Sequence, residues 1–90
     1  MADIEDYLLK LASGELYPEL TTAERFIIGH ALGMLVGINQ ALRQCGAPQK
    51  VIDDLLERAS ALTPLFAIAH TDAITNGWFH SLTAPNTYIH

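Results

Sequence analysis

One stretch of the sequence is both long and free of charge, and it restricts the possible folds more than any other feature. No charged residue occurs from Phe26 to Leu42. Apolar residues at helical spacing predict one helix over about residues 21–45, which Thr21 and Glu24 open as a capping box. Because this helix is apolar on nearly every side, it must be enclosed by other helices or by another chain.

The remaining sequence predicts three shorter helices around this central one. Gly14 is a natural helix end, while Pro48 and Pro64 each fit the first turn of a new helix. No segment shows the alternation of a strand. The four predicted helices lie over about residues 4–13, 21–45, 48–62 and 64–75. We therefore predict a small all-α, four-helix domain spanning residues 1–90, with an irregular segment over 78–90 that holds at most one short turn.

A stripe of small residues follows one side of the central helix. Gly29, Gly33, Gly37 and Ala41 recur at every fourth position, and His30 falls on the same side. A glycine inside a helix costs about 1 kcal/mol relative to alanine, so close approach of another backbone is the expected compensation. That backbone belongs either to another helix of this chain or to a second chain. We expect His30 to be buried and hydrogen-bonded across the contact.

Two adjacent aromatic residues, Trp78 and Phe79, mark the start of the C-terminal segment. Asp72 is the only charged residue after Arg58, so an uncovered aromatic here would form a sticky patch. One interpretation is that both fold back to close the end of the helical bundle. Since neighbouring side chains point in different directions, we predict instead that one enters the core and the other contacts a second chain.

The composition excludes several classes of function. The net charge is −5, and the five basic residues are scattered singly, so we expect no binding to nucleic acid. Charged residues make up 17% of the chain against about 25% in typical domains, which favours a surface partly covered by another chain. We expect no membrane segment and no signal peptide. A single cysteine, Cys45, fits a reducing compartment, so the predicted location is cytoplasmic.

No arrangement of residues predicts catalysis or a cofactor, and we expect the chain not to be an enzyme. The alternative to an interaction protein is a small-molecule or metal-binding domain that uses His30, His70, Asp72 and His80. Imidazoles and carboxylates are zinc ligands, but no two of these histidines have the i, i+4 spacing that places two ligands on one helix face.

The sequence thus predicts a protein–protein interaction module, either homo-oligomeric or binding and blocking a partner protein. Its predicted interface consists of Gly29, Gly33, Gly37, Ala41, His30, Trp78 and Phe79. Short length, a neutral surface and the absence of catalytic motifs are also the general character of phage or mobile-element accessory proteins, although no motif identifies one.

Overall fold

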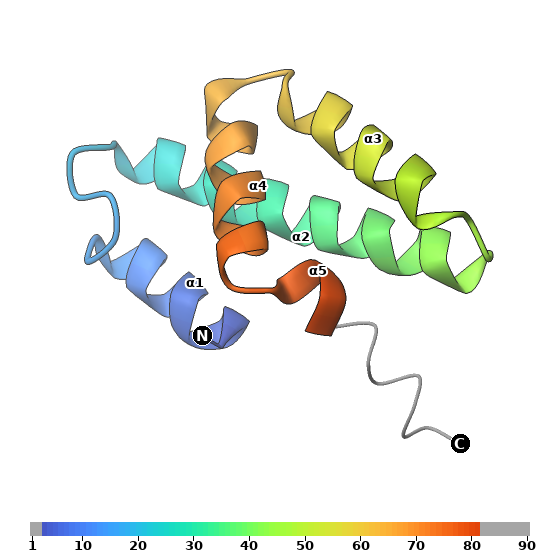
Figure 1. Ribbon diagram of the computed structural model, residues 1–90. Coiled ribbons are helices and arrows are strands. Elements are labelled where there is room, and N and C mark those ends of the chain that lie inside the picture. The colour runs from blue at the N-terminus through green and yellow to red at the C-terminus, as the bar shows by residue number, and fades with distance from the viewer. Residues whose placement is uncertain (1–2, 82–90) are drawn as a thin grey trace.

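The computed structural model describes residues 3–81, and this part of the chain is all-α with no strand. It contains four helices of ten residues or more and one short helix, labelled in Figure 1. The helices are α1 (Ile4–Ser13), α2 (Thr22–Gln44), α3 (Gln49–Ser60), α4 (Pro64–Thr75) and α5 (Trp78–Ser81). The predicted fold class is confirmed.

Local signals in the sequence account for most of the helix ends. The Thr21 side chain accepts a hydrogen bond from the Glu24 backbone, and the Glu24 carboxylate accepts one from the Thr21 backbone, which completes the capping box. Thr63 caps α4 in the same manner, because its hydroxyl accepts from the Phe66 N–H. Pro48 differs from the prediction, since it precedes α3 as the N-cap residue and does not occupy the first turn.

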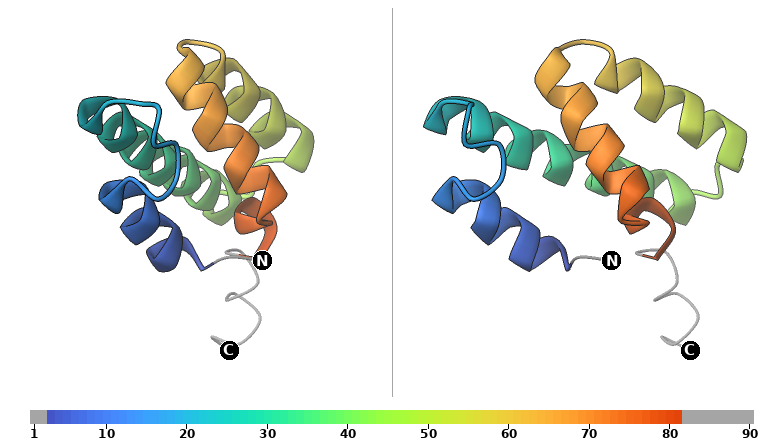
Figure 2. Two further views of the ribbon diagram at one scale, coloured as in Figure 1. Left: turned by 90° about the vertical axis from the view of Figure 1, so that its left-hand side faces the viewer. Right: turned by 60° about the vertical axis from the view of Figure 1, so that its left-hand side comes forward.

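Helix α2 is the longest element, and the other helices are arranged around part of its surface (Figures 1 and 2). Helix α4 crosses α2 near its middle. Helix α1 lies beside the N-terminal half of α2, and α3 lies beside the C-terminal half. The Arg25 guanidinium fixes the connection between α1 and α2, because it donates to the carbonyl oxygens of Leu11 and Leu20 at 3.0 and 2.6 Å.

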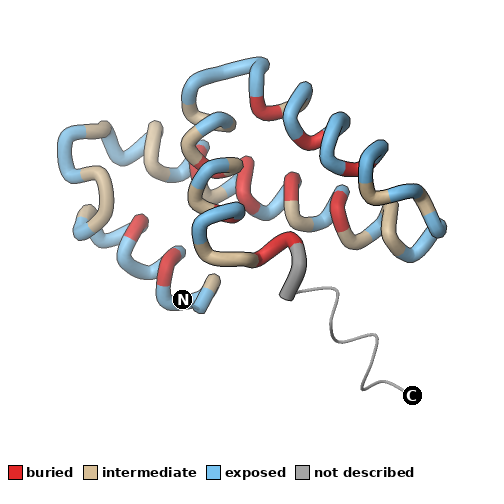
Figure 3. Tube along the Cα trace, viewed as in Figure 1, coloured by how far each residue is buried: buried red, intermediate tan, exposed pale blue. Residues whose placement is uncertain are grey.

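The core lies where α2 and α4 cross, as the buried segments in Figure 3 show. It is built from aliphatic side chains of all the long helices and from the aromatic residues of α1 and α5. The buried apolar residues are Tyr7, Leu11, Ile28, Ala31, Leu32, Leu35, Ile52, Leu56, Ala69, Ala73, Trp78 and Phe79. One polar side chain, Asn39, is fully buried among them, and its amide donates to the Phe79 carbonyl oxygen at 2.8 Å.

The C-terminal segment begins with a turn of helix. Gly77 has a positive φ of 71°, which lets the chain reverse after α4 and begin α5 at Trp78. This is the short turn that the sequence allowed near the tryptophan. The rest of the predicted irregular segment, residues 82–90, lies outside the described residues.

Candidate interaction surface

One side of α2 carries small and apolar residues that all remain exposed. We call this side the α2 outer face. It consists of Phe26, Ile27, His30, Gly33, Met34, Gly37, Ile38 and Ala41. Phe26 is 60% exposed, although a side chain of this kind is normally buried. In the left view of Figure 2, α2 lies at the edge of the molecule with α4 on its other side. Within the described residues, the uncharged stretch is therefore left uncovered along the α2 outer face.

The glycine stripe is only partly covered by the chain itself. A Cβ atom at Gly29 would lie 3.4 Å from a methyl group of Leu8 and 3.5 Å from one of Leu11, so α1 approaches this position closely. At Gly33 and Gly37, no atom of the described residues would lie within 4 Å of an added Cβ. Among the described residues, the stripe thus packs within the chain at Gly29 and has no such neighbour at Gly33 or Gly37.

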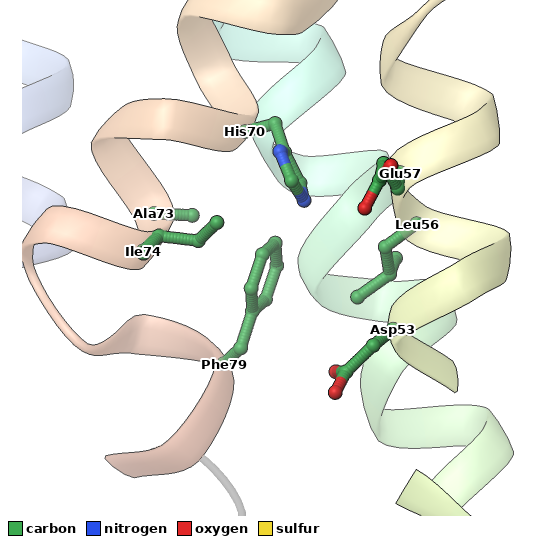
Figure 4. Close-up of a pocket in the computed structure, with 7 residues that line it drawn as sticks. All are labelled: Asp53, Leu56, Glu57, His70, Ala73, Ile74 and Phe79. Carbon is green, nitrogen blue, oxygen red and sulfur yellow. The ribbon is translucent and has the colours of Figure 1, made fainter. Parts of the chain in front are cut away.

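A second exposed apolar patch lies on α3. Asp53 and Glu57 occupy the flank of α3 that faces α4 and α5 (Figure 4). Val51 and Leu55 lie on the other flank of the same helix, and they are 45% and 44% exposed. We call these two residues the α3 flank. Leu55 and Ile38 are equally far from the turn between α2 and α3, so they lie at about the same level of this pair of helices. Helices α1 and α3 lie on opposite sides of α2, with α4 crossing it (Figure 1), and the α3 flank and the α2 outer face are both turned away from α4.

Both C-terminal aromatic residues are buried, so the prediction that one of them turns outward is wrong. Trp78 is 4% exposed and packs edge-on against Tyr7, with 5.0 Å between the ring centroids. Phe79 is 6% exposed and packs against His70, with 5.7 Å between the ring centroids. The two side chains do point in different directions, but α5 lies between α1 on one side and α3 and α4 on the other. Each direction therefore leads into the core.

The three described side chains of the alternative ligand site, His30, His70 and Asp72, are not brought together. His30 is exposed on the α2 outer face, which also contradicts the expectation that it is buried. His70 lines a cavity of about 220 Å³ between α3, α4 and α5 (Figure 4). Asp72 is bound by tyrosines of α1 and of the loop that follows it, while the side chain of His80 lies outside the described part of the chain. Within that part, no group of three His, Cys, Asp or Glu residues could hold a metal ion.

Sequence analysis missed a pair of tyrosines that share one carboxylate. The hydroxyl groups of Tyr7 and Tyr17 both donate to Oδ2 of Asp72, the second at 2.7 Å. Burial, followed by the hydrogen bond to Asp72, raises the pKa of Tyr7 well above its ordinary value and raises the pKa of Tyr17 to about 12. Tyr17 also has a positive φ of 53°, which costs roughly 1–2 kcal/mol for a non-glycine residue. The shared carboxylate therefore holds α1 and its loop against α4.

None of the described helices is long and apolar enough to cross a lipid bilayer. Models of protein families, curated proteins and solved structures were compared with this chain, and none of them matches it.

Proposed function

We propose that this chain is a small, non-enzymatic protein–protein interaction module that binds a second copy of itself through the α2 outer face. The observation that carries the proposal is the open space around Gly33 and Gly37. Together these two glycines cost about 2 kcal/mol of helix stability relative to alanine. Alanine would fit at both positions in the single chain, so nothing within the described residues offsets this cost. Contact with the backbone of a second copy supplies the missing reason for glycine.

The area of the exposed apolar surface agrees with a dimer interface. The α2 outer face and the α3 flank contain six large apolar side chains that are 37–60% exposed. An aromatic residue buries roughly 150–250 Å² when it is fully covered, and a large aliphatic residue lies near the lower end of this range, so these six present roughly 450–500 Å² of surface. A standard interface takes about 800 Å² from each partner, and slightly more than half of this area is apolar. The surface is therefore large enough for one stable contact.

The absence of charge on this face favours a partner with the same character. A face without aspartate, glutamate, lysine or arginine offers little charge complementarity that would select a charged partner. A copy of the same face is apolar over the same length, and a two-fold contact uses one surface twice. Binding and blocking of a different protein through this face is the alternative, and it requires the purified chain to remain a monomer.

The proposal is tested by the mass of the protein in solution as a function of concentration, measured by analytical ultracentrifugation. We expect a dimer for the natural chain and a folded monomer for Met34→Glu, because Met34 is 43% exposed and its charge would be buried only in the dimer. The matched control is Leu9→Glu, which places the same charge on an exposed leucine opposite the buried side of α1. A natural chain that stays monomeric up to millimolar concentration would overturn self-association.

A further inference from the structure

We infer that the two copies lie antiparallel, with their α2 helices crossing at Gly33 and Gly37 and with the α3 flank of each copy covering Ile27 of the other. This inference rests on the proposed function and adds the orientation of the two copies. It follows from the position of two apolar patches that a single chain leaves apart.

The two patches lie at opposite ends of the same edge of α2. Ile27, Met34 and Ile38 share this edge, because they are seven and four positions apart along the helix. Helix α3 runs along the C-terminal half of α2 and does not reach its N-terminal end (Figure 1). Ile27 is consequently 43% exposed at one end, while the α3 flank is exposed at the other end.

Only one of the two possible two-fold arrangements joins these patches. If the two-fold axis is perpendicular to α2, the helices are antiparallel and both α3 helices stay on the same side of the pair. The α3 flank of one copy then lies beside Ile27 of the second copy. If the axis is parallel to α2, the second α3 lies on the opposite side and leaves Ile27 uncovered. An antiparallel pair also aligns the helix dipoles favourably.

The sizes of the residues along the face fit the antiparallel arrangement. Positions about equally far from the midpoint of the crossing lie opposite each other, so Gly33 faces Gly37, and His30 lies within one residue of the level of Ala41 on the same edge. The larger member of the second pair meets a small one, and the glycines allow the two backbones to approach where the helices cross. In a parallel pair each residue would face the same residue of the second copy, so Phe26 would lie opposite Phe26 and His30 opposite His30.

Disulfide mapping tests the orientation. In a Cys45→Ser background, the double variant His30→Cys/Ala41→Cys is oxidised mildly, and the linked peptides are identified by mass spectrometry. Within one helix these positions are about 16 Å apart, whereas a disulfide requires Cα atoms within about 7 Å. A bond between positions 30 and 41 therefore has to join two chains. We expect this bond in a covalent dimer and no bond between identical positions.

The outcomes separate the orientation from the proposed function. A dimer whose disulfides join 30 to 30 or 41 to 41, or a dimer that forms none, overturns the antiparallel arrangement and leaves self-association intact. A reduced double variant and a natural chain that are both monomeric overturn the proposed function itself.

A second measurement does not depend on introduced cysteines. Leu55→Glu places a charge on the α3 flank, which contacts the second copy only in the antiparallel arrangement. We expect the dissociation constant to rise at least tenfold, with the helical circular dichroism unchanged because Leu55 is 44% exposed. The control Leu9→Glu should leave the dissociation constant unchanged. An unaltered dissociation constant for Leu55→Glu would rule out the proposed cover of Ile27.

Discussion

Replacing the two exposed glycines of α2 with alanine should have opposite effects on the folding of the chain and on its association. The double variant Gly33→Ala/Gly37→Ala adds two methyl groups at positions where no described atom lies within 4 Å. Each methyl group improves helix propensity by about 0.8–1 kcal/mol, so the free energy of unfolding of the single chain should rise by about 1.5–2 kcal/mol. For a domain of this size, the melting temperature should increase by about 6–16 °C.

The same methyl groups should weaken the dimer, because they enter the point at which the two α2 helices cross. Overpacking of a close contact costs about 1–3 kcal/mol, which raises the dissociation constant roughly 5- to 150-fold. The assay is urea unfolding followed by circular dichroism, at concentrations far below and far above the dissociation constant. Both concentration ranges are necessary because association adds to the apparent stability of the chain as its concentration rises. We expect the double variant to be more stable than the natural chain when dilute.

Gly46→Ala is the control for a general effect of glycine replacement. Gly46 has a φ of +80°, which alanine adopts at a cost of about 1–2 kcal/mol, so this variant should be less stable at every concentration. Loss of stability in the dilute Gly33→Ala/Gly37→Ala variant would show that the stripe packs within its own chain. An unchanged dissociation constant would show that the two faces do not meet at these glycines.

Two further predictions concern the buried aromatic residues and the shared carboxylate. Trp78→Ala and Phe79→Ala should each lower the free energy of unfolding of the dilute chain by about 3–5 kcal/mol in urea titrations, because both side chains are in the core. A loss below about 1 kcal/mol for either variant would place that side chain outside the core. Tyr17→Phe removes one donor to Asp72 and should cost about 1–2 kcal/mol at pH 7. In the natural chain the raised pKa of Tyr17 keeps its proton in the folded state while the unfolded state loses it above pH 10. The stabilisation from Tyr17 should therefore be fully present below pH 10, and the free energy of unfolding should fall between pH 10 and 12. This fall should be smaller in Tyr17→Phe. An equal fall in the free energy of unfolding of both proteins would contradict the assignment.

The parts of the fold that sequence analysis predicted well depend on local signals. Thr21, Thr63 and Pro64 act on backbone groups within one helical turn, so the beginnings of α2 and α4 could be derived without knowing the rest of the molecule. The glycine spacing marks a side of α2 that has no neighbour at Gly33 and Gly37 among the described residues. Periodicity alone, however, does not say whether a neighbour covers an apolar side.

The errors concern residues whose environment depends on distant segments. His30 was expected to be buried because its helix lacks charge, but no described helix lies over that side of α2. The prediction that one of Trp78 and Phe79 turns outward fails because α5 lies between other helices, so that both side-chain directions lead into the core. The hydrogen bonds of Tyr7 and Tyr17 to Asp72 join residues 65 and 55 positions apart, and no short motif encodes such a pair.

The link between the tyrosines and Asp72 also bears on the order in which the domain assembles. Bringing residues so far apart in the chain into contact requires closing a long loop, whereas α2, α3 and α4 are consecutive and meet through short turns. We expect the three consecutive helices to form the folding nucleus and α1 to dock afterwards. Detachment of α1 alone would then be the local opening of the native state with the lowest free energy. The hydrogen bonds to the Asp72 carboxylate raise the free energy of this opening.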